Sequence, residues 1–345
     1  MKRIHFLSII LLSLLLPQLL AACSAKAKWF NSLSDALQSA QEKGLPVFLL
    51  FSGEDWDGAT ATLKKDVLNT KEFAEDFTDS YILANLDFSQ AEYAKTVLDE
   101  TSTAKQREEA GRILAEYEEK EKLAARYALN NQYPCIYILS KEGYVLAVIP
   151  YSEALKSVAD LENLIGIQQG AITQLSALIE RVNMSTGAEK AKAIDALYEA
   201  SPESYRLPLS DLTDSIASLD VQDTTGLRGK YGLISAWNKA MLEMQSGDTA
   251  NTVDNYLSRC EAARLAPEEL QEAYYTAAYM LAVLGSSDYD RMYGLLQKSM
   301  DAAPESGHTG DITLMMNEIR EMQQRFLEAQ KSSQGASTDA EAEAR

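Results

Sequence analysis

The chain contains few of the residues that usually carry catalysis or bind metals. Its 345 residues include three cysteines, Cys23, Cys135 and Cys260, and two histidines, His5 and His308. No Cys-x-x-Cys pair occurs, so neither a disulfide framework nor a zinc site is supported. With one histidine outside the N-terminal segment, His-rich metal sites and His-based catalytic triads are also disfavoured. We therefore expect no metal and no cofactor.

Positive charge is scarce as well. The chain has 32 Lys and Arg against 51 Asp and Glu, which gives a net charge of -19. A surface this acidic argues against nucleic acid as a partner, and against binding an anionic membrane by charge. Walker, GxGxxG and GxSxG motifs are also absent from the sequence, so nucleotide-binding and hydrolase signatures are missing.

The N-terminal segment has the features of an export signal. Two basic residues precede an almost wholly apolar stretch from Ile4 to Leu20. The sequence Leu20-Ala21-Ala22-Cys23 then resembles a bacterial lipobox, which is cleaved before a cysteine whose thiol takes the lipid. An uncleaved membrane anchor is the alternative, but the stretch is short for a span and Pro17 interrupts it.

This interpretation predicts where the mature protein is located. Residues 1–22 are predicted to be a lipoprotein signal peptide and residues 23–31 a tether. Lipidation at Cys23 would anchor the chain to a membrane of the cell envelope, on the periplasmic or extracellular side. That compartment is oxidising.

The residues from Pro46 to Thr70 predict a strand, a turn and a helix. An unbroken apolar run over 46–51 is typical of a strand buried on both faces. A short polar turn follows at 52–56, and apolar residues then recur at helical spacing over 57–68. A strand, a turn and a helix N-terminus together form a place where chemistry is often done.

The flanking segments complete an α/β domain over residues 32–167. A helix is expected from Ser32 to Gly44, where the glycine ends it, and a second strand over 81–88. A polar helical insertion covers about 91–131, interpreted as one or two surface helices laid over the sheet. Two strand patterns, Cys135–Leu139 and Tyr144–Ile149, flank a hairpin loop, and a helix ends the domain.

This order of elements resembles the thioredoxin fold, specifically the thiol-disulfide-interchange type of exported bacterial proteins. The residues that carry the resemblance lie between about 27 and 167: Trp29, the 46–51 strand, Trp56, the Leu86-Asp87 strand end, Tyr133-Pro134 and Lys141-Glu142-Gly143. In that family a cis-proline stands where Pro134 stands here. The resemblance implies a thioredoxin-like domain.

The sequence departs from the family at the active-site turn. Asp57-Gly58-Ala59-Thr60 stands in place of Cys-x-x-Cys, so Asp57 replaces the attacking cysteine and Thr60 the resolving one. Redox cycling needs a thiolate and a second thiol, and a carboxylate and a hydroxyl supply neither. We expect Asp57 to cap the helix through the N–H of Ala59 or Thr60, and no catalytic residue at this turn.

Other residues near the turn suggest a binding surface. By resemblance, Tyr133 and Pro134 face the turn beside Trp56, and these three residues are predicted to form a groove for an extended peptide. Cys135 follows directly. It is either a buried strand cysteine or a thiol near the groove.

Residues 168–330 show helical stripes and no obvious strand. Repeated Tyr-Gly-Leu triplets at 231 and 293 resemble helical hairpins of the tetratricopeptide type, although no clean period of 34 occurs. We expect an all-α helical array, with a disordered acidic tail over 331–345.

Three functions remain open from the sequence. The first is a redox-inactive, lipid-anchored protein that binds or scaffolds exported or envelope polypeptides, with the helical half adding a second concave surface. The second is a thiol-exchange or isomerase enzyme that uses Cys135 as a single thiol. The third is a structural envelope component with no peptide groove.

Overall fold

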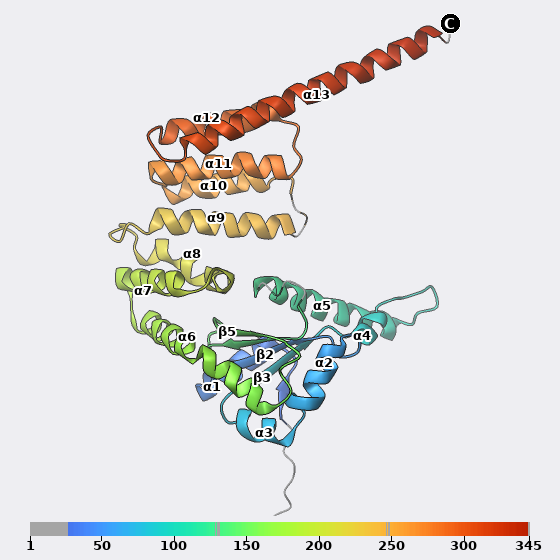
Figure 1. Ribbon diagram of the computed structural model, residues 1–345, viewed down its shortest axis with the longest axis vertical. Helices are drawn as coiled ribbons and strands as arrows, with labels where there is room; N and C mark the ends of the chain where they lie inside the picture. Colours follow the sequence, from blue (N-terminus) through green and yellow to red (C-terminus); the bar gives the residue numbers. More distant parts are fainter. Residues whose placement is uncertain (1–26, 128, 130–131, 246, 248, 344–345) are drawn as a thin grey trace, which may run out of the picture.

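The protein is an α/β domain followed by a helical array, as the sequence predicts (Figure 1). A computed structural model describes residues 27–343, apart from 128, 130, 131, 246 and 248. The expected signal peptide and Cys23 lie outside these residues. The elements of the first part are β1 (Trp29–Phe30), α1 (Leu33–Lys43), β2 (Val47–Ser52), α2 (Gly58–Leu63), η1 (Lys64–Leu68), α3 (Lys71–Phe77), β3 (Ile82–Asp87), α4 (Gln90–Ala94), α5 (Ala104–Arg126), β4 (Cys135–Leu139) and β5 (Val145–Pro150).

A five-stranded mixed sheet forms the centre of this part, in the order β1-β3-β2-β4-β5. Strands β1, β3 and β2 are parallel, whereas β4 pairs antiparallel with both β2 and β5. All six residues of β2 are buried, which explains its unbroken apolar run. The carboxyl end of β2 therefore leads into the turn before α2 from the middle of the sheet.

Alternate residues of the strands face two separate cores. Phe48 and Leu50 of β2 belong to the core that also contains Leu63 of α2 and Leu161 of α6. Leu49 and Phe51 belong to the opposite core, beneath α1 and the end of α5. A strand buried on both faces needs both layers, because successive side chains point to opposite sides.

The predicted tether is wrong in its last residues. Trp29 and Phe30, which were assigned to it, form β1 and pair with Leu83 and Ala84 of β3. The cause is aromatic packing: the indole of Trp29 stacks on Phe73 with ring centroids 5.9 Å apart and meets Phe48 edge to face.

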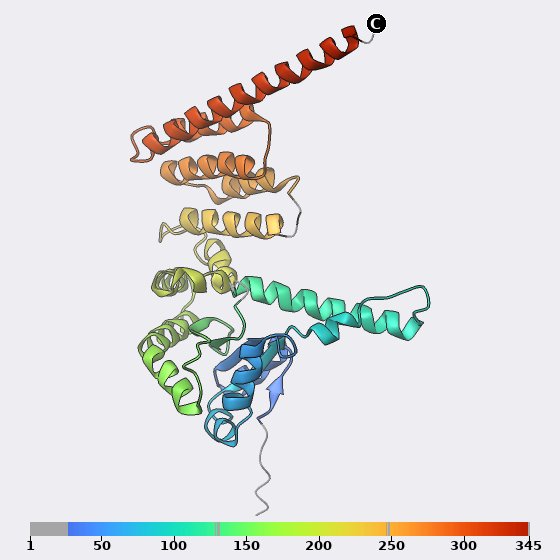
Figure 2. The ribbon, with the colours of Figure 1, turned by 45° about the vertical axis from the view of Figure 1, so that its right-hand side comes forward.

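The helical insertion consists of α4 and α5. Thr103 and Gln106 form a capping box at the start of α5. Its buried residues are Ala110, Ile113 and Tyr117, while Glu–Arg and Glu–Lys pairs cover its outer face. Figure 2 shows that α5 extends well past the sheet, so the prediction of helices laid over the sheet is correct only for its C-terminal end.

The second part of the chain is helical. Its elements are α6 (Val158–Met184), α7 (Gly187–Ala200), η2 (Glu203–Tyr205), η3 (Leu207–Leu209), α8 (Ser210–Leu219), α9 (Arg228–Gln245), α10 (Thr252–Ala263), α11 (Pro267–Val283), α12 (Tyr289–Ala302) and α13 (Thr309–Glu343). Figure 1 shows α7 to α13 stacked in layers above the sheet, with α6 beside the sheet. Helices α9, α11 and α13 begin at residues 228, 267 and 309, so alternate helices start 39 and then 42 residues apart. The uneven spacing explains why no period of 34 is found.

The expected boundary at residue 167 falls inside α6. Leu161 and Ile165 of this helix join the core of the sheet, and Ile179 and Val182 join the same cluster at α7. The cluster continues to Tyr231 in α9. One continuous apolar surface along α6 therefore fixes the first helices to the sheet.

The last helix, α13, continues to Glu343, whereas a disordered tail was expected over 331–345. Ile312, Met316 and Ile319 are buried near the start of the helix. Once such a packed turn exists, each further residue adds a hydrogen bond at little cost, and no proline interrupts the segment. In the part of the chain that the structure describes, no helix is both long and apolar enough to cross a membrane.

Candidate functional site

The turn between β2 and α2 is built by Gly53. Its carbonyl accepts hydrogen bonds from the backbone N–H groups of Trp56, at 3.2 Å, and Asp57, at 2.7 Å. A Cβ atom at Gly53 would lie 2.3 Å from the indole ring of Trp56. The indole can therefore lie against the turn only because residue 53 has no side chain.

Asp57 and Thr60 form a closed polar contact at the start of α2. The Asp57 carboxylate accepts hydrogen bonds from the N–H of Thr60, at 2.8 Å, and from its hydroxyl, at 2.6 Å. Thr60 is fully buried and its hydroxyl oxygen accepts from the N–H of Gly53. Asp57 is thus the N-cap of α2, as predicted, and Thr60 ties the helix to the turn.

The neighbouring acidic residues are all used within the structure. Asp55 accepts from the Ser89 hydroxyl and from the N–H groups of Gln90 and Ala91, and so caps α4. These hydrogen bonds lower the pKa of Asp55, with the Ala91 N–H contributing most. Glu54 forms a 2.6 Å ion pair with Lys64. Among the described residues, no cluster of histidine, cysteine or acidic side chains could hold a metal ion.

Trp56 is held across the end of the sheet. Its indole N–H donates to the carbonyl of Phe88 at 2.6 Å, and 41% of the residue remains exposed. Tyr133 meets the indole edge to face, with ring centroids 5.3 Å apart. A half-exposed aromatic pair fixed by a hydrogen bond offers a rigid surface for apolar or polar contacts.

Two further aromatic residues extend this pair. Phe88 packs against Tyr133 at 5.5 Å, and Tyr117 of α5 packs against Phe88 at 6.1 Å. The Tyr117 hydroxyl donates to the carbonyl of Ser89. Sequence reasoning missed both residues, although an aromatic in the apolar stripe of the insertion was a usable signal for Tyr117.

The Tyr133-Pro134 peptide bond is cis, as the resemblance implies. Pro134 itself is buried, whereas Tyr133 is partly exposed. The structure thus corrects one residue of the predicted groove. Pro134 can hold Tyr133 in place, but it offers no surface to a partner.

Cys135 lies on the other side of the sheet from α2. It pairs with Phe51 in β2 and belongs, with Tyr137, to the core beneath α1. The residue is 2% exposed, and burial raises the pKa of its thiol to about 11. Cys135 is therefore a buried strand cysteine, the first of the two alternatives that the sequence leaves open.

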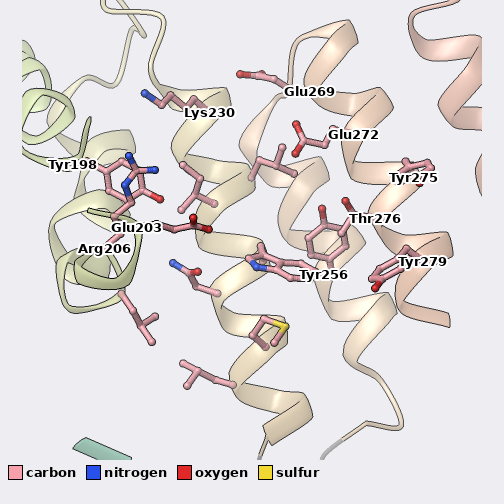
Figure 3. Close-up of a pocket in the computed structure, with 17 residues that line it drawn as sticks. Tyr198, Glu203, Arg206, Lys230, Tyr256, Glu269, Glu272, Tyr275, Thr276 and Tyr279 are labelled. Carbon is pink, nitrogen blue, oxygen red and sulfur yellow. The ribbon is translucent and has the colours of Figure 1, made fainter. Parts of the chain in front are cut away.

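A second hollow lies in the helical array and was not predicted as a site. It has a volume of about 760 Å³ and is lined mainly by α9 and α11. In Figure 3, Arg206 and Lys230 occupy one side, and Glu269 and Glu272 the other. Lys230 is already paired with Asp195, at 2.7 Å, and with Glu199, at 2.6 Å.

Known proteins resemble both parts of the chain. Residues 28–139 match the family described as thioredoxin-like, and residues 227–325 match a family described as an uncharacterised protein C-terminal domain. The first part of the chain is therefore a thioredoxin-like domain, and a helical domain follows it.

Individual relatives also match only parts of the chain. The thioredoxin-related protein DsbJ of Chlamydia pneumoniae is 33% identical over 91 residues, which is 26% of this chain and 26% of that protein. An uncharacterized protein of Treponema pallidum is 24% identical over 183 residues, or 52% of this chain and 60% of that protein. The chain thus matches about a quarter of one relative and 60% of the other. A solved structure, DsbH Oxidoreductase, is 19% identical and covers 48% of this chain and 95% of its own, with a TM-score of 0.32.

Proposed function

We propose that this chain is a redox-inactive thioredoxin-like protein of the cell envelope that binds exported polypeptides at the corner formed by Trp56 and Tyr133. The observation that carries the proposal is the replacement of both thiols by the hydrogen-bonded pair of Asp57 and Thr60. A carboxylate and a buried hydroxyl cannot exchange disulfides. The turn, the helix start and the exposed aromatic pair are nevertheless retained.

The properties of Cys135 give no support to the alternative of a single-thiol enzyme. Nucleophilic attack requires the thiolate, and a pKa of about 11 leaves this thiol protonated at neutral pH. Its burial in the core beneath α1 also keeps the thiol away from solvent. We therefore assign Cys135 a packing role.

Crosslinking tests the polypeptide-binding corner. A photoreactive residue placed at Gln132, which is exposed beside Tyr133, should crosslink to a reduced and alkylated model polypeptide that cannot refold. The same residue at Glu180, exposed on α6, is the matched control and should crosslink only weakly. Replacing Trp56 and Tyr133 by Ala should remove most of the Gln132 crosslink. An undiminished crosslink in that double variant would reject the corner as the binding site.

Lipid labelling tests the envelope anchor separately. Cells that express the chain and are fed an alkyne-bearing fatty acid should incorporate the label, and Cys23→Ala should abolish it. The basic and apolar N-terminal segment before Cys23 supports this expectation. An unlabelled wild-type chain would remove the lipid anchor from the proposal but leave the binding corner unaffected.

A further inference from the structure

We infer that the helical array carries a second binding surface, which accepts a cationic amphipathic segment of another polypeptide. The surface follows the exposed sides of α11 and α13, and we call it the acidic-aromatic groove. It is defined by Glu272, Tyr275 and Tyr279 of α11 and by Leu314, Glu318 and Met322 of α13. It is separate from the corner at Trp56.

Three neighbouring hollows lie along this groove. The 760 Å³ hollow beside α9 and α11 shares Tyr275 with one of about 510 Å³ near His308 and with one of about 300 Å³ between α11 and α13. Tyr279 lines both the first and the third. A row of neighbouring hollows along α11 suits a segment of chain better than a compact small molecule.

The groove exposes large apolar side chains at helical spacing. Tyr279 is 50% exposed, Leu314 60% and Met322 39%. Residues 272, 275 and 279 are three and four positions apart, and residues 314, 318 and 322 are four positions apart, so each set forms a stripe on one side of its helix. Contiguous exposed apolar side chains of this kind often mark an interaction site.

The charges of the groove determine the partner. In the described part of the chain, Glu268, Glu272, Asp311 and Glu318 line these hollows and form no ion pair. By contrast, the two cations at the edge, Lys230 and Arg206, are occupied by Asp195 and Glu199. A partner that brings lysine or arginine beside apolar side chains would satisfy both features of the surface.

A second copy of this chain is a poor occupant. With a net charge of -19, two copies repel one another, and bringing the groove against another acidic surface would add unpaired carboxylates. The cationic segment must therefore come from a different polypeptide. The carboxylates would attract it, and the tyrosine, leucine and methionine side chains would bury its apolar face.

Fluorescence anisotropy with the full chain tests the inference. The probe is a labelled amphipathic peptide of lysine and leucine, and the comparison peptide has glutamate in place of every lysine. The lysine peptide should bind, more weakly at high salt, and the glutamate peptide should not. Equal binding of the two peptides would overturn the inference.

Charge-reversal variants locate the binding. In the double variant Glu272→Lys, Glu318→Lys, the affinity for the lysine peptide should fall by about tenfold or more, because attraction becomes repulsion. The matched control reverses exposed Glu162 and Glu261, outside the groove, with the same change in net charge, and should change affinity by less than about twofold. Equal losses in both variants would mean that only overall charge matters and would refute the groove.

Two further double variants complete the test. In Tyr279→Ala, Leu314→Ala the affinity for the lysine peptide should also fall by about tenfold, a loss that a purely electrostatic attraction would not produce. Trp56→Ala with Tyr133→Ala separates the two surfaces, because binding that survives this double variant takes place outside the corner. If that variant instead abolishes binding, the peptide binds at the corner and the groove is rejected.

Discussion

The carboxylate of Asp57 and the hydroxyl of Thr60 meet at 2.6 Å, at the two positions where the thioredoxin-type resemblance places cysteines. The Asp57 carboxylate satisfies the Thr60 N–H in the first turn of α2, and the Thr60 side chain fills the buried side of that turn. A helix N-terminus that stabilises a carboxylate also stabilises a thiolate. The site therefore has no thiol at either position, while the helix N-terminus that would stabilise a thiolate is present.

Restoring both cysteines should restore redox activity. In the Asp57→Cys, Thr60→Cys variant, the start of α2 should lower the pKa of the residue 57 thiol, and residue 60 can resolve the mixed disulfide. We expect the double variant to reduce insulin disulfides in the presence of dithiothreitol, well above the wild-type rate. The turbidity of precipitating insulin chains measures this activity.

The single variant Asp57→Cys is the control for this prediction. It has an attacking thiol but no resolving thiol, so it should accumulate mixed disulfides without turnover. An inactive double variant that folds and forms the 57–60 disulfide would show that the surroundings of the turn no longer support exchange.

Substitution of Gly53 should displace Trp56. In Gly53→Ala the new Cβ would lie 2.3 Å from the indole ring, so the ring must move and its hydrogen bond to the Phe88 carbonyl should break. A freed indole meets more water, and we expect the tryptophan emission to shift to longer wavelength. Gly58→Ala is the control, since a Cβ there meets no atom within 4 Å.

An unchanged emission spectrum in Gly53→Ala would show that Trp56 is not held against the turn. The chain has two other tryptophans, Trp29 and Trp237, so the comparison should be repeated in Trp56→Phe. In that background Gly53→Ala should no longer change the emission, because the residue that reports the clash is gone.

Sequence patterns predicted the elements around the corner because each depends on nearby residues. The apolar run of β2 and the cap at Asp57 are local features, and both are confirmed. The orientation of Cys135 could not be predicted in the same way. Side chains alternate along β4, and the face to which Cys135 points depends on how α2 and α1 cover the sheet.

The acidic residues of the turn show the same limit. Asp55 stands beside Glu54 and close to Asp57 in the sequence, yet it caps α4, a helix that begins 35 residues later in the chain. The exposed stripe of α11 was also ambiguous. Its buried neighbours, such as Ala278 and Leu281, form the core of the array, and only the packing of α9, α11 and α13 shows which side stays open.

The thiol of Cys135 should resist alkylation in the folded protein. Raising the pKa from 9.0 to about 11 makes the thiolate fraction about a hundredfold smaller at neutral pH, and the strand is buried as well. With iodoacetamide at pH 8, we expect slow labelling of native protein and rapid labelling in denaturant, with peptide mapping to identify Cys135. Cys260, also buried with a thiol pKa of about 11, should behave alike. Rapid labelling of native Cys135 would reopen a role for its thiol.

Acid should weaken the junction between α8 and α9 through Asp220. Burial alone would raise the pKa of this carboxyl, but hydrogen bonds from the N–H groups of Thr225, at 2.7 Å, and Thr224, at 3.0 Å, outweigh it and hold the pKa at about 2. The pKa is lower in the folded state than the ordinary value of about 3.9 in an unfolded chain. The carboxylate therefore stabilises the fold fully above about pH 4, and this contribution is lost as the pH falls toward 2. Asp220→Asn lacks the charge, so the difference in thermal midpoint between wild type and variant should be largest above pH 5 and should shrink between pH 4 and pH 2. A difference that stays constant over that range would contradict the assigned pKa.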